Sequence, residues 1–108
     1  MDILFKTDDL RLLCSSEHEA KRRLGAPSAR KLRARLEDLA AAVRVTDLIA
    51  GRPHPLKGDR LGEFALDLHG GCRLVFEPAI EPIPTKDGVT DWSQVMSVRM
   101  TFIGDYHD

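Results

Sequence analysis

Two short segments, far apart in the sequence, carry the residue types that move protons and bind phosphate. The first is His54-Pro55-Leu56-Lys57-Gly58-Asp59-Arg60, and the second is Asp105-Tyr106-His107. Histidine titrates near neutral pH and can act as a general acid or a general base. Arginine grips a phosphate through two donors, and lysine acts as a point charge. If the fold brings the segments together, they form an acid–base pair with cationic support.

Such a set is what cleavage of RNA through its own 2′-hydroxyl needs. A base removes the 2′-hydroxyl proton, cations hold the phosphate, and an acid protonates the departing 5′-oxygen. Each proton-transfer group typically contributes ~10²–10⁴-fold to the rate. The spacing of His54, His69 and His107 matches no known metal-ligand motif, so we expect no metal and no cofactor.

Each residue, taken singly, also has an ordinary structural interpretation. His54 precedes a proline and therefore lies outside a helix, where most histidines are plain surface residues. His107 is the penultimate residue, and chain ends often fray. Tyr106 could stack on a base or anchor the terminus to the core. Asp105 could orient an imidazole or be solvated.

Length and composition predict one globular domain over residues 1–108. No apolar run approaches the ~20 residues of a membrane span. The N-terminal residues 1–6 are too short and too acidic for a signal peptide, so we expect a cytoplasmic protein. Cys14 and Cys72 fit neither a disulfide framework nor a zinc site, and we expect buried reduced thiols.

The net charge of −1 is unevenly distributed. Residues 21–44 hold eight Lys or Arg against Glu37 and Asp38, while the flanking segments are acidic. Such a block can be a nucleic-acid footprint, a surface for an acidic partner, or a solvated helix face. Charge alone favours the solvated face, and the overall balance counts against RNA binding.

Local patterns predict helices in the first half of the chain. Asp8 or Asp9 could cap a helical turn, and Ser16 with Glu19 forms a capping-box pattern that starts a helix. Pro27 suits the first turn of the next helix. That helix has one apolar stripe at spacings of three and four residues, made of Leu32, Leu36, Leu39 and Val43.

Alternating residues predict strands over residues 2–6, from Phe64, and over 94–103. Gly70-Gly71 make a hairpin turn, and residues 78–91 form a surface loop. The predicted class is α+β, with two antiparallel helices on one face of an antiparallel sheet. The other face carries the polar residues Asp67, His69, Arg73, Arg99 and Thr101. Continuing the last strand in phase adds Asp105 and His107 to that face.

Five segments together resemble the HigB-type toxins of the RelE/ParE superfamily. The similarity spans nearly the whole chain, and its more specific parts are Leu56-Lys57-Gly58-Asp59-Arg60 and Asp105-Tyr106-His107. The full set comprises residues 23–27, 29–36, 54–60, 73–78 and 105–107.

This resemblance implies a RelE-like fold, with an N-terminal strand and two antiparallel helices packed on a curved antiparallel sheet. The RNase members cut mRNA in the ribosomal A site without metal and leave a 2′,3′-cyclic phosphate. A helix-turn-helix antitoxin, HigA, neutralises the toxin, and operator DNA is bound only through it. Matching positions imply a catalytic set of His54, Asp105, Tyr106 and His107, and a phosphate-binding set of Lys57, Arg60 and Arg73.

Two other functions remain open. A ParE-type toxin that binds DNA gyrase would need no histidine pair, and a non-toxic domain could serve only partner binding and transcriptional control. The chain also departs from the family in its acidic balance and in its longer loop from Pro78 to Asp91. The sequence does not indicate which histidine is the base and which is the acid.

Overall fold

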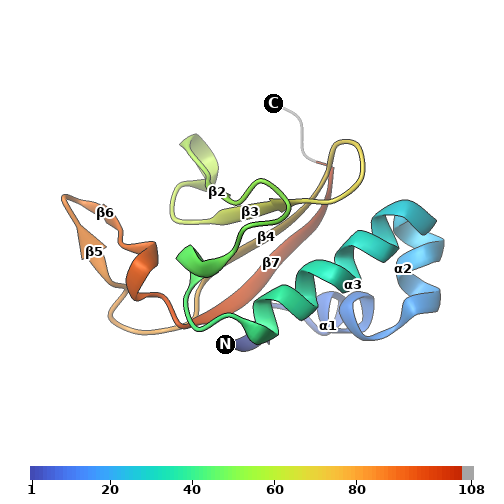
Figure 1. The fold of residues 1–108 in the computed structure, drawn as a ribbon, viewed down its shortest axis with the longest axis horizontal. Helices are drawn as coiled ribbons and strands as arrows, with labels where there is room; N and C mark the ends of the chain where they lie inside the picture. The colour runs from blue at the N-terminus through green and yellow to red at the C-terminus, as the bar shows by residue number, and fades with distance from the viewer. Residues whose placement is uncertain (106–108) are drawn as a thin grey trace.

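The helices and the main sheet form two layers in the computed structural model, which describes residues 1–105 (Figure 1). The helices are α1 (Asp8–Ser15), α2 (Glu17–Leu24) and α3 (Ala26–Ala41). The sheet has the strand order β1-β7-β4-β3-β2. Its strands are β1 (Asp2–Phe5), β2 (His54–Pro55), β3 (Phe64–Asp67), β4 (Cys72–Pro78) and β7 (Ser97–Asp105). The predicted α+β class is therefore confirmed, with a third helix added.

That third helix, α1, extends over eight residues where only a helical turn was expected. Its cap is Thr7, whose Oγ1 accepts a hydrogen bond from the Leu10 N–H at 3.1 Å. The predicted caps, Asp8 and Asp9, instead lie in the first turn. There their negative charges interact favourably with the positive end of the helix dipole.

The starts of α2 and α3 agree with the sequence pattern. Ser16 caps α2 by accepting a hydrogen bond from the Glu19 N–H at 3.1 Å, and Pro27 lies in the first turn of α3. The stripe of α3 is confirmed at Leu32 and Leu39, which are 1% and 0% exposed. Val43 is 59% exposed and was wrongly included, because the helix ends at Ala41.

The apolar core lies between the helices and one face of the sheet. Buried residues from both layers pack into it, among them Leu13, Leu32, Leu39, Leu66, Leu74, Phe76, Val98 and Met100. The sheet is antiparallel except at one edge, where β1 pairs with β7 in parallel. A parallel neighbour needs a long connection, and nearly the whole chain lies between these two strands. We call the sheet face turned away from the helices the open face.

Smaller elements lie between the main helices and strands. β5 (Thr85–Lys86) and β6 (Val89–Thr90) form a separate hairpin that projects from one end of the molecule (Figure 1). A 3₁₀ turn, η2 (Gly58–Arg60), connects β2 to β3. Within residues 1–105, the helices are all too short or too polar to span a bilayer.

Candidate functional site

The last strand changes phase at Thr101. Val75 pairs with Phe102, whereas the next residue of β4, Phe76, pairs with Met100. Two positions of β7 therefore correspond to one step of β4, and Thr101 is the extra residue of a β-bulge. Residues beyond the bulge point to the faces opposite those predicted by continuous alternation.

The bulge corrects the predicted position of Asp105. This residue pairs with Cys72 rather than sharing the phase of Arg73. Cys72 packs against the core beneath α3, and paired residues point to the same side of a sheet. Asp105 thus belongs to the helix-covered side at the strand end, and the expected in-phase placement is wrong. Tyr106 and His107 lie outside the described residues.

A row of residues crosses the open face from β2 to β7. His54 pairs with Ala65, Ala65 with Val75, and Val75 with Phe102. The guanidinium of Arg60 lies over the Phe102 ring, 4.6 Å from its centroid, in cation–π geometry. Ala65 and Val75 lie in the middle of this row and are completely buried, so longer neighbouring side chains cover them. His54 and Arg60 are therefore two of the predicted site residues that share one surface.

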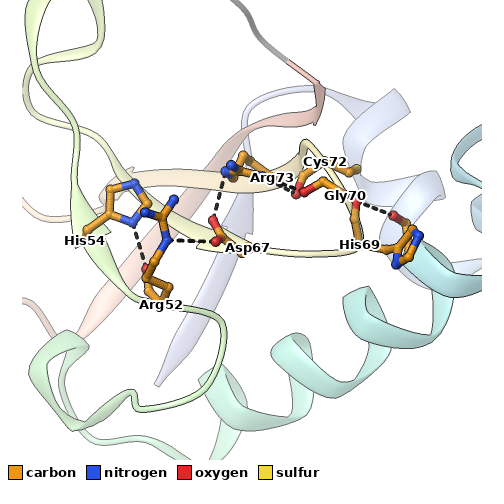
Figure 2. Close-up of polar contacts among 8 residues, drawn as sticks. Arg52, His54, Asp67, His69, Gly70, Cys72 and Arg73 are labelled. Atoms are coloured by element: carbon orange, nitrogen blue, oxygen red, sulfur yellow. Dashed lines mark hydrogen bonds and ion pairs between the residues drawn. The ribbon is translucent and has the colours of Figure 1, made fainter.

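A second row contains Asp67, which holds two arginines (Figure 2). Asp67 Oδ1 lies 2.8 Å from Arg73 Nε, and Oδ2 accepts a hydrogen bond from Arg52 Nε at 2.9 Å. Arg73 Nη1 also donates to the carbonyls of Gly70 and Cys72, at 3.1 and 3.2 Å. Arg73 is thus fixed to the hairpin turn and to β3, while its Nη2 takes part in none of these contacts.

The imidazole of His54 has a defined hydrogen bond. Its Nδ1 lies 2.7 Å from the backbone carbonyl oxygen of Arg52 (Figure 2). A carbonyl oxygen can only accept, so Nδ1 must carry the proton of this bond. The neutral ring then presents an unprotonated Nε2, and the side chain is only partly buried. His54 can therefore exchange a proton with a bound molecule through Nε2.

The two remaining predicted phosphate ligands differ in their surroundings. Lys57 is exposed at the start of η2. Arg60 pairs with Glu63 at 3.1 Å, and the other Glu63 carboxylate oxygen accepts a hydrogen bond from the Thr101 hydroxyl. His69 lies apart, in the hairpin turn, where its carbonyl accepts a hydrogen bond from Ser28 Oγ of α3 (Figure 2). The predicted residues are thus partly gathered, with His54, Arg60 and Arg73 on the open face.

Neither cysteine has the character of a nucleophile. Cys14 and Cys72 are free and partly buried. Burial raises the pKa of the Cys14 thiol to about 12, and burial also raises the pKa of Cys72. A reactive cysteine needs a lowered pKa, because the thiolate is the attacking form. In the described part of the chain, no group of three or more His, Cys, Asp and Glu side chains could hold a metal ion.

Sequence patterns did not assign a role to Arg52 or Asp67. Strand phase placed Asp67 on the open face, but its partner Arg52 is distant in sequence and lies in a turn. Arg52 has a φ of 48°, and it stands between Gly51 and Pro53. Glycine and proline around one residue indicate a turn. They do not indicate that the turn directs a carbonyl toward His54.

Comparison with solved structures gives an informative similarity. No protein-family model matches the sequence, and no curated protein matches it. The structure is similar to that of a YoeB/ParE toxin from Agrobacterium tumefaciens, with a TM-score of 0.58. The alignment has 14% identity and covers 99% of this chain and 100% of the other. The chain therefore has the fold of this YoeB/ParE toxin.

Proposed function

We propose that the chain is the toxin of a type II toxin–antitoxin system, of the HigB type within the RelE/ParE superfamily. In this proposal it cleaves mRNA on the ribosome and so inhibits translation in the cytoplasm. The observation that carries the proposal is the position of His54, on the same sheet face as two arginines of the predicted phosphate-binding set. The toxin fold supports the general class, and the sequence resemblance suggests the subtype.

The proposed reaction needs no metal. A base takes the proton from the 2′-hydroxyl, the 2′-oxygen forms a bond to phosphorus, and the bond to the 5′-oxygen breaks as an acid protonates that oxygen. We assign these proton transfers to His54 and His107, with Tyr106 completing the catalytic set. Asp105 belongs to the helix-covered side of β7, so in this proposal it can act only on groups at the strand end. The groups that hold the phosphate are Lys57, Arg60 and Arg73.

Two of these cations enter the reaction already paired. Arg60 forms an ion pair with Glu63, and Arg73 forms one with Asp67. Each carboxylate offsets the positive charge of its arginine before RNA binds. A phosphate would use the donors that those pairs leave available, as with Nη2 of Arg73. Within residues 1–105 Lys57 makes no such pair, and it is exposed, so it is suited to make the first contact with RNA.

The partners in this proposal are the ribosome, its mRNA and a HigA-type helix-turn-helix antitoxin. Operator DNA would be bound only through the antitoxin. The basic block of residues 21–44 is proposed to meet ribosomal RNA or an acidic surface of the antitoxin. Several of its cations already pair with carboxylates, whereas Arg30 and Lys31 are exposed. Reversing Arg30, Lys31 and Arg33 to Glu should weaken one of these two associations, and an unchanged affinity for both would leave the block as a solvated helix face.

The catalytic assignment is tested by expressing His54→Ala and His107→Ala beside the wild type and mapping mRNA 5′-ends. We expect each substitution to lower cleavage by about 10²–10⁴-fold and to relieve growth arrest. His69→Ala is the matched control, because this histidine lies in the hairpin turn beside α3. Growth arrest and cleavage that survive both catalytic substitutions would overturn the assignment.

A second candidate is a ParE-like toxin that binds DNA gyrase without catalysis. The ion pairing of Arg52, Arg60 and Arg73 and the net charge of −1 favour it, since both reduce the attraction for RNA. Expression would then trigger DNA-damage signalling while mRNA stays intact. A wild-type chain that never arrests growth would favour neither candidate and would point to a non-toxic binding domain.

A further inference from the structure

The backbone before His54 adopts a conformation that most residues avoid. Gly51 has a φ of 85° and Arg52 a φ of 48°. Both values lie in the left-handed region, where a Cβ atom is crowded by the following carbonyl. A non-glycine residue persists there only when the surrounding structure holds it. Contacts with the surrounding structure must therefore stabilise the turn at Arg52.

Asp67, at the end of β3, stabilises the turn at Arg52 through its backbone and its side chain. Its backbone N–H donates to the Gly51 carbonyl at 2.6 Å, and its carboxylate binds Arg52 Nε at 2.9 Å. The same carboxylate is itself held by Arg73. A side chain at Gly51 would lie 2.9 Å from Arg35 Cδ and 3.2 Å from the Asp67 carbonyl oxygen. The turn is thus packed tightly against β3.

This turn decides which nitrogen of His54 is protonated. Because the Arg52 carbonyl accepts from Nδ1 at 2.7 Å, the neutral ring is held with its proton on Nδ1 (Figure 2). If the carbonyl moved away, both tautomers would become accessible. Only one of them leaves Nε2 able to accept a proton.

We propose that Arg52 and Asp67 are positioning residues that hold His54 in the tautomer whose Nε2 is the general base of the reaction. The proton of the RNA 2′-hydroxyl passes to Nε2, and the resulting imidazolium keeps its Nδ1–H bond to the Arg52 carbonyl. Another group then protonates the 5′-oxygen, and His107 is that group in the proposed catalytic set. This inference rests on the proposed function for the reaction, whereas the tautomer is a property of the protein without RNA.

Two variants test the positioning, each with a different effect on the turn. Asp67→Asn keeps the size of the side chain and the backbone N–H but removes the charge that holds both arginines. Arg52→Gly removes the guanidinium and leaves a residue that tolerates positive φ. We expect both to populate a mixture of His54 tautomers and to lower cleavage by about 10-fold to 100-fold. Circular dichroism would establish that each variant is folded.

The decisive measurement is the ¹H–¹⁵N correlation spectrum of the His54 ring in purified protein without RNA. At a pH where the ring is neutral, the wild type should show a protonated Nδ1 and an unprotonated Nε2. The matched control is Glu77→Gln, which removes the 2.8 Å ion pair with Arg99 on the same sheet face and should leave the His54 signals unchanged.

The positioning and the proposed function can fail separately. A neutral wild-type ring protonated at Nε2 instead of Nδ1, or folded Asp67→Asn and Arg52→Gly proteins with the wild-type spectrum, would overturn the positioning. A His54→Ala protein that cleaves mRNA normally would instead overturn the proposed function and, with it, the role of Nε2 as the base.

Discussion

The two faces of the sheet are built from the same strands but have opposite characters. On the helix-covered face, alternate residues of β4 and β7, such as Leu74, Phe76 and Met100, are completely buried. On the open face, residues of β3, β4 and β7 form ion pairs, Asp67 with Arg73 and Glu77 with Arg99. Because side chains alternate along a strand, one segment can stabilise the fold on one side and carry chemistry on the other.

This difference is not explained by stability alone. Ion pairs at the surface contribute about 0–1 kcal/mol each, whereas a large buried apolar side chain contributes several times more. The open face would therefore be a weak way to stabilise the sheet. In the proposed function these charges lie where RNA binds, and substitutions on the two faces should separate stability from that function.

The largest expected effect is on the covered face. Phe76 is completely buried and packs against Phe64 and Trp92, with ring centroids 5.5 and 6.3 Å apart. Phe76→Ala should lower the free energy of unfolding by about 3–5 kcal/mol, since it removes apolar contacts and leaves a cavity. Urea denaturation followed by circular dichroism would measure this change.

Val89→Ala is the control for that substitution. Val89 is 56% exposed in the projecting β5–β6 hairpin, so its loss should change the free energy of unfolding by no more than about 0.5 kcal/mol. Equal destabilisation by the two substitutions would contradict the assignment of stability to the covered face.

A smaller effect is expected at Lys57, an exposed residue at the start of η2 that we propose as the first contact with RNA. Lys57→Gln should reduce the slope of log affinity against log salt concentration by about 0.7 for single-stranded RNA. Its free energy of unfolding should stay within about 0.5 kcal/mol of the wild type. Filter binding of a short RNA oligonucleotide over a range of salt concentrations would measure the slope.

The matched control is Lys86→Gln, which removes the same charge from the exposed β5–β6 hairpin. It should leave the slope for a short oligonucleotide unchanged. If both lysines change the slope equally, RNA binding follows the overall charge rather than a site that includes Lys57.

Local signals in the sequence were enough for much of the fold. Ser16 with Glu19, Pro27 and the Gly70-Gly71 turn gave helix starts and a hairpin, because caps and turns depend on residues close in sequence. The alternation of side chains along the strands predicted that Asp67 and Arg73 lie on one face of the sheet, and the structure pairs these two residues across β3 and β4. The catalytic roles of His54 and the terminal segment stay predictions.

Features that depend on distant partners could not be predicted in this way. Phe102 and Ile103 are adjacent apolar residues, so alternation there is compatible with either phase of β7. The phase is set by the bulge at Thr101 and by Arg60, which covers the Phe102 ring on the open face. The turn at Arg52 likewise depends on Asp67, fifteen residues away.

The smallest expected effect returns to the helical layer and concerns the thiol of Cys14. Burial raises the pKa of this thiol from 9.0 to about 12. Above pH 9 the unfolded chain loses a proton that the folded protein keeps, so the free energy of unfolding falls as pH rises. From pH 8 to pH 10 the fall should be about 1 kcal/mol larger in the wild type than in Cys14→Ala, by urea denaturation. Ser15→Ala should behave as the wild type, and equal falls for wild type and Cys14→Ala would show that the folded protein does not suppress ionisation of this thiol.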